Sequence, residues 1–314
     1  MTNRHDIASA SARIAPMIRR TPVCIVGAKD LDLAFLSHSP LTLKLELLQH
    51  TGSFKPRGAF NNLLDPSRPL PPGGHVIAAS GGNHGAAVAF AARASGLVAE
   101  IFVPATTPEA KRRRIAGFGA TLTAIGEDYA AALAASRHRA SATGAIEIHA
   151  YDDPAVIAGQ GTVGCELEEQ APDLTHLLVA AGGGGLLAGI AAWYAGRIAV
   201  IGVEPTACPT LHSARAAGHP VPVATGGIAA DSLGAREAGQ HVFPLIAAHV
   251  ADLVLVPDDA ILAARRLLWD RLRILAEPGG ATALAALLSG AFVPPADARV
   301  GILVCGGNTG ALPE

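Results

Sequence analysis

The chain has 314 residues, half of them hydrophobic, and its 24 basic and 26 acidic residues leave a formal charge of −2. This composition excludes intrinsic disorder, because a solvated chain cannot carry so much apolar surface, and the length suffices for one large or two ordinary domains. The balanced charge and an aromatic content of 4% give no sign of a nucleic-acid partner.

The first predicted helix follows a turn in the N-terminal quarter of the chain. Thr51–Ser53 is expected to form a turn and helix cap, and Pro56 suits a first helical turn, so Lys55 lies at or near a helix N-terminus. The helix dipole disfavours a positive charge there, whereas a nucleophilic amine gains from a lowered pKa. A solvated surface lysine is the alternative interpretation.

From residue 74 onward, β-branched strands alternate with alanine-rich helices, which is typical of mostly parallel α/β sheets. Segment 74–147 is expected to form a small α/β domain. Its basic run 111–114 is expected to be a solvated helix face. Strands are predicted at 75–79, 99–103 and 120–125, and helices at 83–94, from 108 through 114, and at 128–139.

The second half repeats this alternation. Residues 1–73 and 148–314 together are expected to form a large domain. The uncharged segment 177–195 is as long as a membrane span, but its four central glycines are a poor helix interior, which favours a strand, a loop and a helix. Strands are predicted at 177–180, 199–203 and 301–304, and helices at 186–195, 260–275 and 281–288.

The cysteines and the first residues bear on location. The residues Met1–Asp6 contain no apolar stretch of the kind that a signal peptide needs. No two cysteines are close enough in sequence for a CxxC motif, which fits reduced thiols in a cytoplasmic protein better than a disulfide scaffold. The four cysteines are Cys24, Cys165, Cys208 and Cys305.

Three predicted strands end in glycine-rich turns, at 80–85, 182–185 and 305–308. Ligands of open parallel sheets bind at the carboxyl ends of strands, and glycines let backbone amides approach an anion. The three turns together therefore favour a phosphate-bearing ligand over three ordinary tight turns. One candidate is a dinucleotide, since Gly183–Ala188 fits GxGxxA and Glu204 ends the next strand. That NAD-dependent dehydrogenase interpretation leaves the other two turns and Lys55 without a role.

Ser53-Phe54-Lys55 with its flanks resembles the Schiff-base lysine motif of pyridoxal-phosphate enzymes of fold type II, the tryptophan synthase β fold. Within that fold, the chain resembles the serine/threonine dehydratase and serine racemase group. The resemblance implies two open, mostly parallel, twisted α/β domains with the cofactor, pyridoxal 5'-phosphate, in the cleft between them. Further motifs that match in the same order are Arg20–Pro22, Ser80–Gly85, Tyr151–Pro154, Ala158–Thr162, Gly182–Leu186, Gly202–Pro205, Ala276–Pro278 and Cys305–Asn308.

The resemblance assigns most of these residues to the cofactor. Lys55 would hold it as a Schiff base and later take the α-proton, Phe54 would pack on its ring, and Asn83 would bond its phenolic oxygen. The glycine run and the next amide would cradle the phosphate, and Cys305 would face the pyridine nitrogen. The cofactor residues are thus Phe54, Lys55, Asn83, Gly182, Gly183, Gly184, Gly185, Leu186 and Cys305.

The same resemblance assigns the substrate carboxylate to Ser80, Gly81, Asn83 and His84, largely through amides at a helix start. Related racemases carry a serine at the position of Gly81 as the proton donor on the second face of the α-carbon. Because glycine has no side chain, the sequence favours a dehydratase over a racemase. A neutral thiol at Cys305 cannot protonate the ring, which favours fast β-elimination.

The resulting hypothesis is an ammonia-lyase that converts threonine to 2-oxobutanoate, or serine to pyruvate, with release of ammonia. Serine racemisation and 3-hydroxyaspartate dehydration are the near alternatives, and a silent ligand-binding protein is a third. A cation site is doubtful, because Glu204 matches one family ligand but Thr210 replaces an acidic one. The resemblance also implies a homodimer and an amino-acid substrate, and we expect no nucleic-acid or membrane partner. Because the chain stops soon after the Cys305 motif, we also expect no C-terminal regulatory domain.

Overall fold

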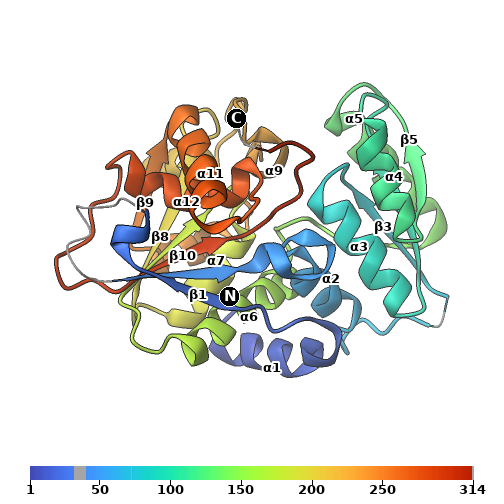
Figure 1. The fold of residues 1–314 in the computed structure, drawn as a ribbon. Coiled ribbons are helices and arrows are strands. Elements are labelled where there is room, and N and C mark those ends of the chain that lie inside the picture. The colour runs from blue at the N-terminus through green and yellow to red at the C-terminus, as the bar shows by residue number, and fades with distance from the viewer. Residues whose placement is uncertain (32–39, 72, 313–314) are drawn as a thin grey trace.

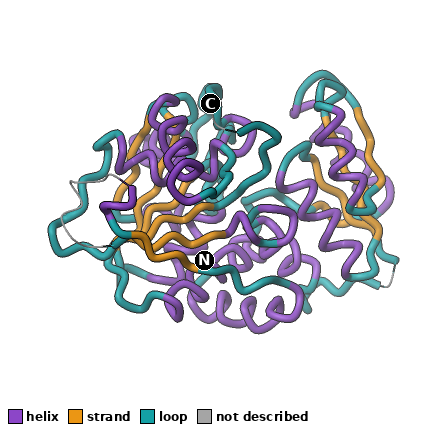
Figure 2. Tube along the Cα trace, viewed as in Figure 1, coloured by secondary structure: helices purple, strands orange, loops and turns teal. Residues whose placement is uncertain are grey.

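A computed structural model describes residues 1–31, 40–71 and 73–312 of the chain. Figure 1 shows two lobes side by side, each built around its own sheet. The strands of the two sheets are well separated in Figure 2, and helices lie between them. Within the described ranges no helix is long and apolar enough to cross a membrane.

The large lobe contains a six-stranded sheet in the order β1-β2-β10-β7-β8-β9. Its pairs are parallel except for the antiparallel pair of β1 and β2. Buried apolar runs such as HLLVA in β7 suit strands that are covered on both faces. The strands are β1 (Val23–Val26), β2 (Leu41–Leu45), β7 (His176–Ala180), β8 (Ala199–Pro205), β9 (Asp252–Val256) and β10 (Val300–Val304).

Helices cover both faces of this sheet. In Figure 1, α11 and α12 lie on one side of it, and α1 and α6 lie on the other. The helices of this lobe are α1 (Arg4–Ile14), α2 (Lys55–Leu63), α6 (Pro154–Gln170), α7 (Gly185–Tyr194), α8 (Thr210–Ala217), α9 (Ala230–Leu233), α10 (Phe243–His249), α11 (Asp258–Leu272) and α12 (Pro278–Leu288). Short 3-10 helices occupy Ala15–Met17, Ala28–Leu31, Glu46–Leu48 and His50–Gly52.

The small lobe contains a four-stranded, all-parallel sheet in the order β5-β4-β3-β6. Helix α5 packs on β3 and β4, and it begins at an Asp128 cap and ends at Gly144 in the left-handed region. The strands are β3 (His75–Ala79), β4 (Val98–Val103), β5 (Thr121–Ala124) and β6 (Ile146–Glu147), and the helices are α3 (Asn83–Ala94), α4 (Glu109–Gly117) and α5 (Tyr129–Thr143).

The predicted α/β class with mostly parallel sheets is confirmed. The small sheet lies within the segment 74–147 that we expected to be a separate domain, while the exact domain boundaries stay a prediction. The core does not divide cleanly, because Ile14, Phe60 and Val156 share one hydrophobic cluster with the small sheet. Helix α2 accordingly packs against α6 of the large lobe and α3 of the small one.

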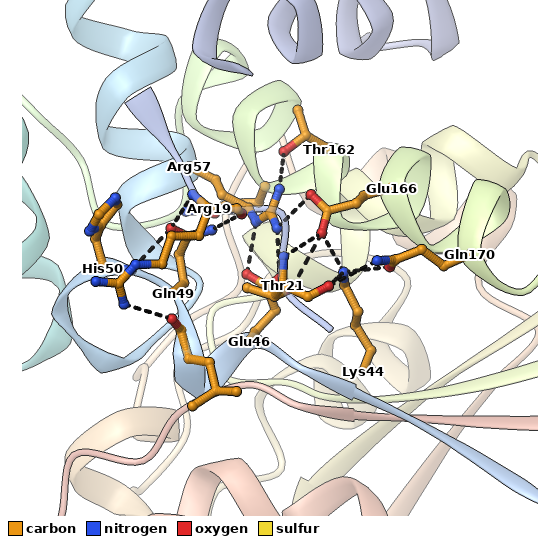
Figure 3. A network of polar contacts seen from close by, with 12 residues as sticks. Arg19, Thr21, Lys44, Glu46, Gln49, His50, Arg57, Thr162, Glu166 and Gln170 are labelled. Carbon is orange, nitrogen blue, oxygen red and sulfur yellow. Dashed lines mark hydrogen bonds and ion pairs between the residues drawn. The ribbon is translucent and has the colours of Figure 1, made fainter. Parts of the chain in front are cut away.

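A buried ion cluster, formed by Lys44, Glu46, Arg57 and Glu166, fixes α2 to the large lobe (Figure 3). Arg57 donates to both oxygens of Glu46, at 2.8 and 2.7 Å, and to Glu166 at 3.0 Å. Lys44 Nζ lies 2.5 Å from Glu166 Oε1. Two cations therefore meet two carboxylates with no net charge, which is the arrangement that buried ions need.

Candidate active site

The turn that leads into α2 has an unusual backbone. Thr51, with φ of 58°, and Gly52, with φ of 70°, both adopt the left-handed region, which a β-branched threonine rarely does. Ser53 forms an isolated bridge with Gly306, so the turn lies against the end of β10. The predicted cap on Ser53 is wrong: Phe54 is the N-cap and no side chain caps the helix, although the helix does begin at Lys55 as expected.

Lys55 is a partly buried amine that has no carboxylate partner among the described residues. Its Nζ donates a hydrogen bond of 2.8 Å to the carbonyl of Ala150 and lies 5.1 Å from the centre of the Phe54 ring. Desolvation lowers the pKa of Lys55 to about 8, although Cys305 and Glu277 act to raise it. At pH 7 about a tenth of this amine is therefore unprotonated and nucleophilic, far more than of an ordinary lysine.

Cys305 lies beside this lysine at the end of β10. The Phe54 amide donates to the Cys305 carbonyl at 3.2 Å, and the thiol itself contacts the carbonyl of Gly279 at 3.4 Å. Burial, and then the charge of Glu277, raise the pKa of Cys305 far above its ordinary range. The thiol is thus neutral, as the sequence hypothesis requires, and it can offer a hydrogen bond without transferring a proton.

The glycine run at the end of β7 forms a bare backbone loop into α7. Gly184 has a φ of 92°, and a Cβ at Gly183 would lie 2.6 Å from atoms of the Tyr151 ring. The amides from Gly183 to Leu186 have no hydrogen-bond acceptor among the described residues. Unpaired amides at a helix start are what a phosphate needs, so the loop fits the phosphate of pyridoxal phosphate.

The second glycine turn begins α3 in the small lobe. Ser80 Oγ accepts from the Gly82 amide at 3.2 Å, and the amides of Gly81, Asn83 and His84 lack acceptors in the described part of the chain. The ring of His84 is buried, and its Nε2 lies 2.8 Å from the Ile148 carbonyl. Burial, with Lys55 nearby, lowers the pKa of His84 to about 3. Only the His84 amide, and not its charge, can then serve an anion.

A side-chain network ties this turn to the large lobe. Asn83 Nδ2 donates to Glu277 Oε1 at 2.7 Å, and Asn308 Nδ2 donates to Asn83 Oδ1 at 2.5 Å. Asn308 also donates its amide to Glu277 at 3.2 Å and its side chain to the Thr51 carbonyl at 2.9 Å. Both functional atoms of Asn83 are thereby oriented, which leaves the second Nδ2 hydrogen for a ligand.

The short helix α9 lies against both glycine turns and against the start of α12. A Cβ at Gly82 would lie 3.8 Å from the Asp231 carbonyl, and one at Gly182 would lie 2.8 Å from the Leu233 carbonyl. A Cβ at Gly279, whose carbonyl faces Cys305, would lie 2.1 Å from Ser232 Oγ. The structure therefore brings together Lys55, Phe54, Cys305, both glycine turns and Asn83, which the sequence analysis grouped into one site.

Glu204, near the end of β8, serves as a helix cap. Its two oxygens accept from the amides of Leu211 and His212, each at 2.7 Å, and Thr210 Oγ1 donates to the Ala235 carbonyl. Burial raises the pKa of Glu204 to about 7. No group of three metal-ligating side chains occurs among the described residues.

Several residues around the site were not given a role by the sequence. Glu277 and Asn308 stand inside matched motifs, and a buried acid next to a proline-initiated helix was the available signal. Ala150 and Tyr151 act through a carbonyl oxygen and a ring face, which no residue pattern specifies. Tyr151 donates its hydroxyl to the Glu237 carbonyl at 3.1 Å, and burial raises its pKa to about 12.

Comparison with known proteins shows which family and which relatives the chain resembles. A family model described as "Pyridoxal-phosphate dependent enzyme" matches residues 14–306. The chain is 39% identical over 253 residues to an L-threonine ammonia-lyase of Geobacter sulfurreducens, in a match that covers 80% of this chain and 63% of that protein. It is 36% identical to a phenylserine dehydratase of Ralstonia pickettii, over 97% of this chain and 93% of that one.

The fold also has solved counterparts. The structure of maize serine racemase superposes with a TM-score of 0.90 at 33% identity, covering 98% of this chain and 94% of that one. The two-lobed arrangement is therefore shared from end to end.

Proposed function

Because the chain belongs to the family of pyridoxal-phosphate dependent enzymes, we propose that it is an ammonia-lyase acting on L-threonine, L-serine or both. The products are a 2-oxo acid and ammonia, with threonine giving 2-oxobutanoate and serine giving pyruvate. The names of the similar threonine ammonia-lyase and phenylserine dehydratase support elimination from a β-hydroxy amino acid.

One observation carries the proposal: the amine of Lys55 is desolvated, is paired with no carboxylate in the described part of the chain, and lies beside a neutral thiol. A structural lysine in such a place would need an anion next to it. An amine that must attack an aldehyde and later accept a proton instead needs to be neutral part of the time, which a pKa of about 8 provides.

The residues present fit pyridoxal phosphate. Lys55 would hold it covalently, Phe54 would pack on its ring, and Asn83 would donate to its phenolic oxygen through the Nδ2 hydrogen that the network leaves free. The amides from Gly183 to Leu186 would hold its phosphate, and Cys305 would face its ring nitrogen. When bound, the cofactor supplies an electron-withdrawing ring that makes the α-hydrogen of an amino acid acidic.

The chain's own residues then divide the remaining work. The amides of Gly81, Asn83 and His84 bind the substrate carboxylate, which points the α-hydrogen toward Lys55. Lys55 takes that proton, and the β-hydroxyl departs with a proton as water. The released enamine adds water and loses ammonia, so that threonine yields one 2-oxobutanoate and one ammonia. The neutral Cys305 would face the ring nitrogen of the bound cofactor without donating a full proton to it, a setting that would favour elimination.

The test is a panel of β-hydroxy amino acids assayed for ammonia and 2-oxo acid. The purified protein should be yellow, with an absorbance band that borohydride removes irreversibly. We expect L-threonine or L-serine to give equal amounts of both products, with little D-amino acid in the recovered substrate. A colourless protein that binds NAD would contradict the proposal, and dominant D-serine formation would point to a racemase.

We further propose a cytoplasmic homodimer. The four cysteines are free, which supports a reducing compartment, and the family resemblance supports the dimer. Light scattering of the purified protein should give a mass near twice the chain mass of 31.8 kDa.

A further inference from the structure

The side chain of Thr107 lies next to Gly81, in the space that a side chain at position 81 would need. It lies in the loop between β4 and α4, and a Cβ built on Gly81 would be 3.0 Å from Thr107 Cγ2 and 3.1 Å from Thr107 Oγ1. Separations of that size are tighter than ordinary van der Waals contact, so a side chain at 81 and the threonine compete for the same space. The branched side chain of Thr107 thus takes the volume that glycine leaves open.

The hydroxyl of Thr107 has no hydrogen-bond partner among the described residues, whereas the hydroxyl of the neighbouring Thr106 has one. Thr106 Oγ1 donates to the Glu127 carbonyl at 3.2 Å and so belongs to the small lobe's own loop packing. Thr107 uses only its backbone there, since its amide donates to the Pro104 carbonyl at 3.0 Å. Its side chain is half-buried rather than sealed, so Oγ1 stays accessible to a ligand beside the turn.

The loop that carries Thr107 is held over the site by α4. Lys111 Nζ lies 2.5 Å from Asp231 Oδ1 in α9, and Arg114 donates to the Thr51 carbonyl in the turn before Lys55. The expectation that 111–114 is a solvated helix face is therefore wrong for these two residues. They connect the small lobe to the large one on both sides of the site, and they fix the loop against Gly81.

We propose that Thr107 is a substrate-contacting residue whose hydroxyl donates a hydrogen bond to the carboxylate of the amino-acid substrate. The inference rests on the proposed function, because it places that carboxylate at the free amides of Gly81, Asn83 and His84. The hydroxyl adds one more donor next to those amides. A hydroxyl is suited to this position because it donates to an anion without bringing a charge that would need a partner when the site is empty.

The experiment compares Thr107→Val, Thr107→Ser and the control Thr106→Val in the pyridoxal-phosphate-loaded enzyme. A hydrogen bond to a charged group contributes about 1.5–3 kcal/mol, so Thr107→Val should raise KM for the substrate by about 10- to 100-fold. We expect kcat to change less than about threefold, because the bond exists before and after the proton transfer. Thr107→Ser, which keeps the hydroxyl, should restore KM, and Thr106→Val should leave KM unchanged.

Binding of L-alanine, which has no β-hydroxyl to lose, gives a readout that does not depend on turnover. Its dissociation constant, measured by calorimetry on the loaded enzyme, should rise in Thr107→Val by the same factor as KM. The cofactor absorbance and its affinity should stay as in the wild type. A Thr107→Val variant with unchanged KM and L-alanine affinity would overturn the inference. So would a Thr107→Ser variant that binds L-alanine as weakly as Thr107→Val does.

A paired substitution tests the shared volume. Gly81→Ala alone should weaken L-alanine binding, because the added methyl displaces Thr107. The Gly81→Ala/Thr107→Gly double variant should bind L-alanine as well as the Thr107→Gly single variant does, because the added methyl then has no threonine to displace. Strictly additive effects would overturn the inference while leaving the proposed function standing. A wild type that releases no 2-oxo acid and binds no L-alanine would overturn both.

Discussion

Helix α2 carries two cations, two residues apart, in opposite surroundings. Arg57 is fully buried and faces two carboxylates and the Thr162 hydroxyl, whereas the hydrogen-bond acceptor of Lys55 in the described structure is the Ala150 carbonyl. Although burial acts to lower it, Glu46 and Glu166 raise the pKa of Arg57, while desolvation lowers that of Lys55 to about 8. Within the first turn of α2, one cation thus anchors the helix through matched charge, and the other is an amine that is kept unmatched.

The difference shows how the fold separates stability from chemistry. The ion cluster is complete within the protein, so it needs no ligand and fixes the direction in which α2 leaves the sheet. The Lys55 side has a free amine, unpaired amides and a neutral thiol, which are incomplete without a ligand. Substitutions in the ion cluster should therefore change stability, whereas substitution of Lys55 should change activity.

The largest effect is expected from removing the unmatched amine. Lys55→Ala should lower kcat/KM for ammonia release by at least about 10³-fold, because one side chain both holds the cofactor and moves the proton. The circular dichroism spectrum should match that of the wild type, since no structural partner is lost. Turnover at the wild-type rate in this variant would remove Lys55 from its assigned role.

On the matched side, Glu46→Ala should cost about 3–5 kcal/mol of unfolding free energy, because it leaves Arg57 buried without its bidentate partner. Denaturant melts of the cofactor-free protein measure this loss. Glu169→Ala, which breaks the exposed pair with Arg20, is the control and should cost less than about 1 kcal/mol. Equal losses in the two variants would mean that the cluster is not what anchors α2.

A third prediction compares stability with and without the amine. In cofactor-free protein at pH 7, Lys55→Met should raise the unfolding free energy by about 2 kcal/mol, since charged Lys55 is desolvated only in the folded state. The pKa of Lys55 in the folded protein lies near 8, below the ordinary lysine value of 10.5, so the unfolded state binds more protons between these two pH values. The unfolding free energy of the wild type therefore rises with pH between these values, and the difference from Lys55→Met shrinks.

The control for this pH series is Lys29→Met at an exposed position, which should change stability by less than about 0.5 kcal/mol at any pH. An advantage of Lys55→Met that is constant from pH 7 to pH 10 would show that packing, and not the charge, causes it.

The contrast also explains what the sequence could disclose. Lys55 was singled out by its predicted place at a helix start, and the role of Cys305 came from the family resemblance. The glycine turns were predicted from residue type and local spacing. Their joint position followed from the rule that strand ends of a parallel sheet meet at one edge. The pairing of Thr107 with Gly81 could not be found, because it joins a loop after β4 to a turn after β3. The Ala150 carbonyl was equally hidden, since any residue carries one.

The smallest predicted effect concerns Glu277, a carboxylate whose charge acts on Lys55 without forming an ion pair with it. Burial raises the pKa of Glu277, but Asn83 and the Asn308 amide each donate a hydrogen bond to it, which favours the ionised form. If it is ionised, Glu277→Gln removes a distant negative charge and should lower the pKa of Lys55 by less than about one unit from its value near 8.

The pH dependence of Lys55 acylation in cofactor-free protein measures that pKa, with Lys55→Met as the blank. A midpoint that does not move would mean that Glu277 is already protonated in the folded protein. The two donated hydrogen bonds argue against this, because a protonated carboxyl would turn one of its oxygens into a donor facing the amide of Asn308 or the side chain of Asn83. The shift therefore reports whether the Lys55 side of α2 contains any full negative charge at all.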